Sequence, residues 1–134
     1  MLKAVHSDEG GPWREASERL LREGFARGDV AAFVVDHPLE QARLVAGGVA
    51  VIVQRLGGPH NPSGRYGHVQ SMATDVEFRR QGFARAILAA LLAWFEQRGV
   101  LRVDLHASPM GEHLYRSMGF TEGAEPELRW RSPG

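Results

Sequence analysis

The chain has 134 residues, enough for one domain and too few for two of ordinary size. Hydrophobic residues make up 43% and charged residues 24%, a balance typical of a soluble globular protein and not of a disordered chain. Sixteen basic and sixteen acidic residues cancel, so no overall field draws the protein to nucleic acid or to an anionic membrane. The absence of cysteine excludes a disulfide scaffold, a thiol nucleophile and thiolate-bound metal, and favours a cytoplasmic protein.

The first elements expected are a helix and a strand. Met1–Gly11 is polar and glycine-rich, is expected to be coil, and lacks the long apolar run of a signal peptide. From Trp13 to Phe25 apolar residues recur at helical spacing between charged ones, which predicts an amphipathic surface helix. Val30–Asp36 is rich in β-formers and is closed by His37-Pro38, so it predicts a short strand.

A longer strand and a loop are expected next. Arg43–Leu56 is apolar and long enough for a buried strand paired with Val30–Asp36. Gly47-Gly48 inside it indicates a bulge or a close approach by neighbouring backbone. Gly57–Gly67 contains four glycines and two prolines, which predicts a mobile loop, and long loops in compact domains are often functional.

The second half of the chain predicts alternating strands and helices. The expected elements are a strand at His68–Thr74, a helix from Ala84 to about Gln97 with Gly99 beyond it, a strand at Leu101–His106, a helix opened by Ser108-Pro109 that runs through Tyr115 to Met118 before Gly119, and one or two strands within Phe120–Arg131. Nearly every position of the long helix is apolar, so we expect it to be buried on more than one side. Its apolar stretch, Phe83–Phe95, is too short for a membrane span.

The turn between the His68–Thr74 strand and the long helix is the strongest candidate for a ligand site. In a strand–helix–strand unit with parallel strands, ligands bind beyond the carboxyl end of the first strand, at the helix N-terminus. That point carries Arg79, Arg80, Gln81, Gly82, Phe83, Ala84 and Arg85. Free amides of the first helical turn, a glycine and three arginines suit a phosphate. A solvated arginine patch is the alternative interpretation of the turn taken alone.

Two motifs together carry a family resemblance. Arg79-x-x-Gly82-x-Ala84 follows an apolar strand and opens an Ala/Leu-rich helix, and Leu114-Tyr115-Arg116-Ser117-Met118-Gly119-Phe120 follows the next strand. The pair resembles, in order and spacing, the two signatures of the GNAT superfamily of acyl-CoA-dependent N-acetyltransferases. The resemblance implies a single domain over residues 1–134, with a mixed twisted sheet flanked by helices.

The resemblance also implies where acetyl-CoA, the co-substrate, would bind. Pantetheine would lie along the strand edge at Met72, Ala73 and Thr74, like an added strand. The pyrophosphate would sit on the amides of residues 81–85, with Arg79 and Arg80 nearby. Ser108 stands where the family often has an asparagine that contacts the cofactor arm, and its side chain has a shorter reach.

Tyr115 stands at the position of the family's general acid, and a phenol can give a proton to a leaving thiolate. The alternative is that Tyr115 only packs on the sheet. The acceptor amine also needs a base, for which His68 is favoured because its strand should line the acceptor side. The other candidates are Asp75, Glu77, His106, Glu112 and His113, and each taken singly is also consistent with an ordinary surface group.

These features predict an N-acetyltransferase that passes acetyl directly from acetyl-CoA to a primary amine of a small molecule or a peptide. The six histidines show no close metal-ligand spacing, so no metal site is expected. No nucleic-acid or membrane partner is expected either. A non-catalytic CoA-binding sensor or partner-binding module is the alternative, and a nucleotide-binding protein is disfavoured because its glycine-rich motifs are missing.

The chain departs from the family pattern at its start. Only twelve residues precede Trp13, so the usual first strand and helix have no match here. Without that strand Val30–Asp36 becomes an open sheet edge. We therefore expect either a homodimer that covers this edge or a true start upstream of Met1.

Overall fold

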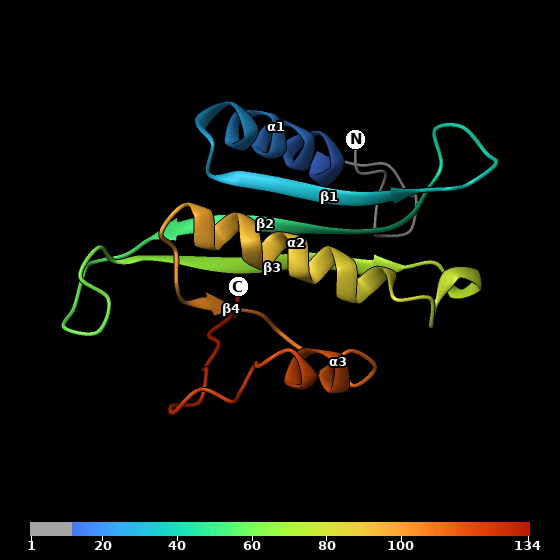
Figure 1. The fold of residues 1–134 in the computed structure, drawn as a ribbon. Coiled ribbons are helices and arrows are strands. Elements are labelled where there is room, and N and C mark those ends of the chain that lie inside the picture. The colour runs from blue at the N-terminus through green and yellow to red at the C-terminus, as the bar shows by residue number, and fades with distance from the viewer. Residues whose placement is uncertain (1–11) are drawn as a thin grey trace.

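The computed structural model describes residues 12–134, which form a four-stranded mixed sheet with helices around it (Figure 1). Its elements are α1 (Pro12–Arg27), β1 (Val30–Asp36), β2 (Leu44–Gln54), β3 (Arg65–Thr74), the 3-10 turn η1 (Val76–Phe78), α2 (Phe83–Gln97), β4 (Val103–Asp104) and α3 (Glu112–Ser117). The strand order is β1-β2-β3-β4, in which β1, β2 and β3 are antiparallel neighbours and β4 runs parallel to β3. The predicted mixed sheet and the parallel strand–helix–strand unit are both confirmed.

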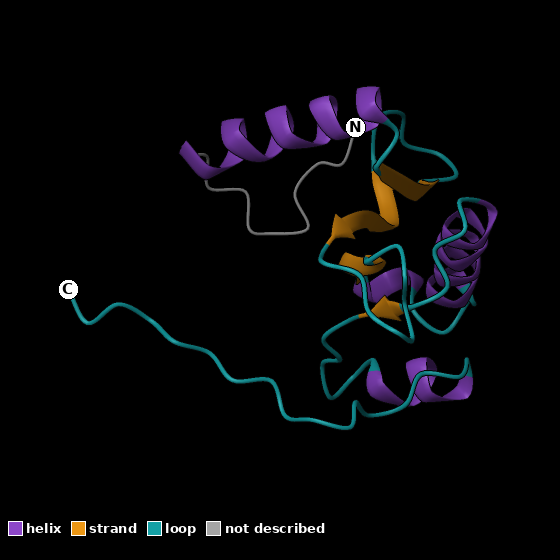
Figure 2. Ribbon diagram, turned by 90° about the vertical axis from the view of Figure 1, so that its left-hand side faces the viewer, coloured by secondary structure: helices purple, strands orange, loops and turns teal. Residues whose placement is uncertain are grey.

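Helix α2 supplies one side of the hydrophobic core, against one face of the sheet (Figure 2). Ile87, Leu88, Leu91 and Phe95 are at most 3% exposed and pack with small residues of the sheet. The prediction that this helix is buried on more than one side is wrong. Ala86, Ala89 and Ala93 are exposed, so the apolar outer face consists of alanines, which are good helix formers and tolerate water.

The predicted irregularity at Gly47-Gly48 is confirmed. The register of β2 and β3 shifts between Gly47 and Val49, and opposite this point Ser71 has a left-handed φ of 56°. A side chain on Gly48 would collide with the Met72 sulfur and would lie 3.0 Å from Ile87. The glycine therefore allows α2 to approach the sheet closely where the bulge bends β3.

The loop Gly57–Gly67 is more ordered by hydrogen bonds than its composition indicates. Arg55 N–H donates to Gly64 O at 2.8 Å, and Gly58 and Asn61 form an antiparallel bridge. The Asn61 side chain also donates to Arg65 O at 3.0 Å. The segment is thus a bonded hairpin connection whose last residues, from Arg65, already belong to β3.

Two elements in the C-terminal half are shorter than expected. The Leu101–His106 strand is reduced to Val103–Asp104, because β3 and β4 pair only at Gly67–Val103 and His68–Asp104. The last helix begins at Glu112 and not at Ser108-Pro109, since Ser108 O accepts from the Gly111 and Glu112 amides in a turn that precedes it.

The predicted strands within Phe120–Arg131 are wrong, because the chain from Phe120 onward has no helix or strand and extends away from the body (Figure 2). Leu128 and Trp130 are 88% and 81% exposed. The outer edge of β4 is two residues long and offers too short a ladder for a further strand.

The other edge of the sheet is β1, which α1 flanks. Gly24 is the buried residue of α1, and a side chain on it would collide with Val30. Among residues 12–134 no strand pairs with the outer side of β1. The coil expected at Met1–Gly11 lies outside the described residues. No helix in the described part of the chain is long and apolar enough to cross a membrane.

Candidate active site

The two parallel strands separate soon after they begin to pair. Gly67 N–H donates to Arg102 O at 2.8 Å, and the last paired residues are His68 and Asp104. Further along β3, Met72, Ala73 and Thr74 are half-buried, and the segment pairs with β2 alone. The edge of β3 that faces away from β2 is therefore open to an extended ligand at the three positions predicted to line pantetheine.

The turn after β3 ends in a helix N-terminus that has no side-chain cap. Gly82 caps α2 in the left-handed conformation (φ 82°) and, having no side chain, bonds none of the first-turn amides; no acidic residue stands in that turn either. A Cβ on Gly82 would meet nothing within 4 Å, so the space above the turn is open. Unbonded amides at an open, glycine-capped N-terminus are what a phosphate requires.

The three arginines of the turn have no carboxylate partner among the described residues. Arg79 Nε donates to Thr74 O at 3.2 Å and ties the turn to the end of β3. Arg85 Nη2 donates to Ser117 Oγ at 2.8 Å, which joins the start of α2 to α3. Arg80 adopts a left-handed φ of 64° and is exposed. The turn therefore keeps its positive charge for an anionic ligand although the whole chain is neutral.

Tyr115 is one of the buried residues of the core, with 9% of its surface exposed. Its ring contacts Phe120 edge to face, with centroids 6.1 Å apart, and lies against Gly111, where a Cβ would be 3.3 Å from the hydroxyl. Burial raises the pKa of Tyr115, because the phenolate would be poorly solvated. The side chain therefore both packs on the sheet and keeps its proton at neutral pH.

His68 lies at the point where β3 and β4 separate. Its Nδ1 is buried with no hydrogen-bond partner, the one such side-chain atom among the described residues. Its ring faces that of His106, with centroids 5.7 Å apart, and His106 Nε2 is 3.4 Å from Glu127 Oε2. The fold thus brings two of the predicted base candidates, His68 and His106, side by side where the strands separate.

The other candidates are occupied elsewhere or point to solvent. Asp75 and Glu77 form ion pairs with Arg43 at 3.2 and 3.7 Å. Glu112 pairs with Arg116 at 3.0 Å, and His113 is exposed. Ser108 Oγ accepts a hydrogen bond from Gly111 N–H at 3.2 Å, so it is used in the turn before α3.

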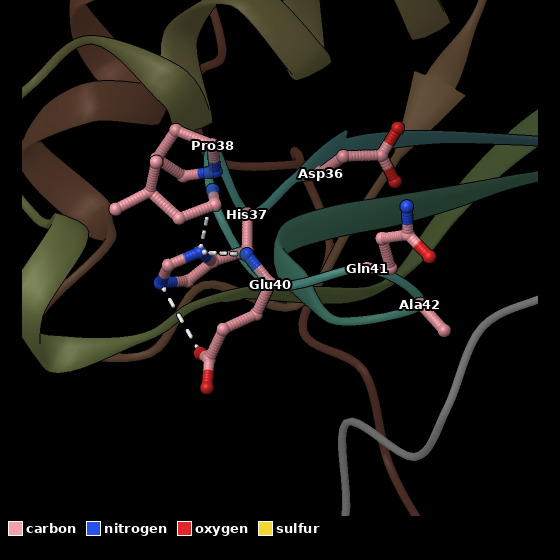
Figure 3. Close-up of a pocket in the computed structure, with 7 residues that line it drawn as sticks. Asp36, His37, Pro38, Glu40, Gln41 and Ala42 are labelled. Carbon is pink, nitrogen blue, oxygen red and sulfur yellow. Dashed lines mark hydrogen bonds and ion pairs between the residues drawn. The ribbon is translucent and has the colours of Figure 1, made fainter.

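A surface hollow of about 430 Å³ lies apart from this site, inside the hairpin loop from Asp36 to Ala42 (Figure 3). His37 holds the loop together: its Nδ1 accepts from the Leu39 and Glu40 amides, and its Nε2 is 3.3 Å from Glu40 Oε2. Its ring also contacts Phe78 of η1, at 5.2 Å between centroids. The loop thus contacts η1, just before the turn at residues 79–85.

Two contacts of the site were not predicted from the sequence. Glu127 lies outside both motifs, and Ser117 lies within the second one without a role assigned to it. Ser117 contacts Arg85 and Glu127 contacts His106, each far away along the chain. In the described residues no group of three His, Asp or Glu side chains is placed to hold a metal ion.

A sheet that opens beside an arginine-bearing helix N-terminus with free first-turn amides is an arrangement that suits a phosphate-containing ligand in extended form. The chain belongs to the acetyltransferase (GNAT) family, whose model matches residues 1–120. Family membership places the protein among the acyl-CoA-dependent acetyltransferases. No curated protein matches the sequence significantly.

Solved structures share the fold at low sequence identity. A predicted acetyltransferase with acetyl-CoA from Clostridium acetobutylicum is 21% identical, with a TM-score of 0.79 over 91% of this chain and 78% of the other. A GCN5-related N-acetyltransferase from Ralstonia eutropha is 24% identical, with a TM-score of 0.72 over 87% and 74% of the chains. Glucosamine-6-phosphate N-acetyltransferase from Arabidopsis thaliana is 18% identical, with a TM-score of 0.73 over 92% and 82%.

Proposed function

We propose that the protein transfers an acetyl group from acetyl-CoA to a primary amine, by direct attack in a ternary complex. The observation that carries the proposal is the turn at residues 79–85, where free amides and uncompensated arginines adjoin the open edge of β3. These 134 residues contain no cysteine, which agrees with transfer without an acyl-thiol on the enzyme.

The cofactor would be held by two sets of groups. The backbone of Met72, Ala73 and Thr74 would bond the pantetheine amides along the open strand edge. The amides of residues 81–85, with the Arg79 and Arg80 guanidinium groups, would bind the pyrophosphate. Ser108 is the weakest member of the proposed set, because its hydroxyl is already used by Gly111.

Two side chains would handle the protons of the transfer. His68 would take a proton from the acceptor nitrogen as the new carbon–nitrogen bond forms. Tyr115 would give its proton to the sulfur as the carbon–sulfur bond breaks; burial raises the pKa of the phenol, so the side chain is protonated before the transfer begins. Both groups would then exchange protons with water before the next cycle.

The acceptor would be a small-molecule or peptide amine. A neighbour in fold is named for acetylation of glucosamine-6-phosphate, which makes amino sugars a class to test early. A cytoplasmic location is proposed with this activity, on the cysteine-free sequence. We also propose that two copies associate through the open β1 edge.

The test is a panel of amines incubated with acetyl-CoA while free thiol is followed. Polyamines, aminoglycosides, amino sugars, amino acids and peptide N-termini cover the acceptor classes, and reactions without protein correct for spontaneous hydrolysis. We expect at least one class to release thiol and yield the acetylated amine. No amine-dependent release from any class, by protein that binds acetyl-CoA, would contradict the proposal.

A non-catalytic CoA-binding module is the second candidate. The side of the sheet where the acceptor amine would bind is exposed, which favours this candidate. The His106 side chain there is 59% exposed, and residues 121–134 do not enclose this side chain. For such a module, acetyl-CoA would bind and no amine would accelerate thiol release.

A further inference from the structure

The arginine turn, residues 79–85, has little regular structure of its own before α2 begins. Residues 79–82 belong to no helix or strand, and η1 before them is three residues long. A loop that binds a ligand is most effective when it is held in one conformation beforehand, because ordering it at the moment of binding lowers the affinity. Contacts from outside the turn are therefore relevant to what it can bind.

Arg43, immediately before β2, supplies such contacts to η1. Its Nη2 donates to the Asp75 carboxylate at 3.2 Å and lies 3.7 Å from the carboxylate of Glu77. The Asp75 amide donates to Val45 O at 2.8 Å. The beginning of β2 therefore holds the beginning of η1 through a side chain and through the backbone.

Arg43 is itself held by the hairpin loop Asp36–Ala42. Its Nη1 donates to the Glu40 carboxylate, which lies 3.3 Å from His37 Nε2. His37 Nδ1 accepts from two amides of the same loop, so the neutral imidazole carries its proton on Nε2, facing Glu40. The His37 ring also contacts Phe78 of η1, at 5.2 Å between centroids. An ionic contact and an aromatic contact thus join this loop to η1.

The charges around Arg43 form a network and not an isolated surface pair. A single exposed ion pair contributes little because water and salt screen it, whereas several charges in one fixed geometry contribute more. Arg43 is the least exposed of the four charged side chains and joins three carboxylates from two separate segments. Without its charge, the three carboxylates would repel one another, and the loop and η1 would no longer attract.

We propose that Arg43 is a positioning residue for the arginine turn: by holding η1 against the hairpin loop, it keeps the amides of residues 81–85 in the arrangement that binds the pyrophosphate of acetyl-CoA. The position of η1 reaches α2 through Phe78, whose ring centroid lies 6.5 Å from that of Phe83. This inference rests on the proposed function and adds to it a residue outside both family motifs. Arg43 acts on cofactor binding and not on the transfer step.

The first test reads the conformation of the turn by amide NMR of the full chain without ligand. Arg43→Gln should shift the signals of residues 78–85. It should also speed hydrogen exchange at the Phe78 and Arg79 amides, which form the backbone bonds of η1. Arg43→Lys keeps the charge and should give smaller shifts.

Arg27→Gln is the matched control for these spectra. It removes an exposed arginine whose ion pair with Asp29, at 3.1 Å, lies at the end of α1. A surface ion pair is lost in both variants, but only Arg43 contacts η1. Arg27→Gln should therefore leave the signals of residues 78–85 unchanged.

The second test is the affinity for acetyl-CoA, measured by isothermal titration calorimetry. Arg43→Gln should weaken binding about fivefold, Arg43→Lys should recover part of the loss, and Arg27→Gln should have no effect. In kinetics, Arg43→Gln should raise KM for acetyl-CoA with unchanged kcat. KM for acetyl-pantetheine, which lacks the pyrophosphate, should not change, whereas a general loss of structure would raise both.

Asp75→Ala separates orientation of the turn from a simple effect of charge. It breaks the link to Arg43 and should weaken acetyl-CoA binding, and the double variant with Arg43→Gln should bind no more weakly than the weaker single one. If charge alone mattered, removing this carboxylate would strengthen binding of an anion.

Two results would overturn the inference: turn signals that Arg43→Gln leaves as in the wild type, or tighter acetyl-CoA binding by Asp75→Ala. The ligand-free spectra decide whether Arg43 orients the turn even for protein that acetylates no amine, which would refute the proposed function alone.

Discussion

At the scale of single residues, a substitution at Gly82 tests whether the turn at residues 79–85 binds a phosphate. Gly82→Asp places a carboxylate where the pyrophosphate should lie. Repulsion between these two negative groups should lower acetyl-CoA affinity by about 100-fold or more. The fold should survive, because a Cβ at this position meets nothing within 4 Å and Asp is among the few residues that adopt left-handed backbone such as the φ of 82° found here. Isothermal titration calorimetry measures the affinity.

The matched control is Gly82→Asn, which has the same shape, tolerates left-handed backbone and can cap the helix. Only the charge distinguishes the two variants, so Gly82→Asn should lose much less affinity. Equal affinities for the Asp and Asn variants would argue against an anion at this turn.

Tyr115→Phe separates the acid role from the packing role. The ring contact with Phe120 is retained and the transferable proton is lost, so kcat should fall by roughly 10²–10⁴ with little change in acetyl-CoA binding. Steady-state kinetics at saturating acetyl-CoA and amine gives the answer. Turnover equal to the wild type would leave Tyr115 as a packing residue.

The raised pKa of Tyr115 makes a separate prediction about stability. The folded state holds the phenol proton more tightly than the unfolded chain, whose reference pKa is 10.0. The stability from this group is therefore complete below pH 10 and is lost as the pH rises through the higher folded pKa. Urea denaturation across alkaline pH should show a steeper loss for the wild type than for Tyr115→Phe, and parallel curves would contradict the assigned burial effect.

How far the sequence predicts the site depends on how local each feature is. The arginine turn, Gly82 and Tyr115 lie within short motifs, and their places in the fold follow from the strand–helix–strand order. The link from His106 to Glu127 joins residues on either side of α3, and no periodicity encodes it. The sequence indicates His68 as a candidate base, but the burial of its Nδ1 depends on packing that no sequence pattern encodes.

At the scale of elements, the contact between Gly67 and Phe95 sets the distance between β3 and α2. A Cβ on Gly67 would lie 2.6 Å from the Phe95 ring, so Gly67→Ala should force α2 outward and cost about 1–3 kcal/mol. The strand pair that begins to separate at Gly67 and His68 would be disturbed with it. Urea denaturation of the variant gives the loss of stability.

A second substitution shows whether this contact is the cause. Phe95→Leu removes ring atoms near Gly67, at its own cost in the core, so the double variant should be more stable than the sum of the two losses predicts. Strictly additive losses would show that the strain of Gly67→Ala lies elsewhere.

The sequence predicts the elements with long apolar patterns well. It predicts poorly the strands whose length depends on a neighbouring strand with which they can pair. The helix Trp13–Phe25 and the strands Val30–Asp36 and Arg43–Leu56 match α1, β1 and β2 closely, because their apolar patterns are long. The strand expected at Leu101–His106 is cut to two residues because β3 diverges from it. The apolar alternation near Leu128 and Trp130 forms no strand, since the edge it would need is too short.

At the scale of the whole molecule, the open β1 edge governs the prediction of self-association. Natural edge strands carry charges or proline that block further pairing, but Val30–Val35 carries neither. On the adjacent helix α1, Leu20 is 64% and Phe25 47% exposed. Antiparallel pairing of β1 with β1 of a second copy would use the same surface on both chains, as a two-fold dimer requires.

The register of β1 supplies a sharp test of this dimer. Ile52 N–H donates to Asp29 O at 2.8 Å, so by alternation the backbone of Ala31 faces β2 and that of Ala32 faces away from it. Ala32→Pro removes an outward amide and should leave a folded monomer, whereas Ala31→Pro removes a bond to β2 and should destabilise the fold. Light scattering at micromolar concentration should give twice the chain mass for the wild type and the chain mass for Ala32→Pro. A wild-type monomer whose β1 outer amides resist hydrogen exchange would instead mean that another part of the same chain covers the edge.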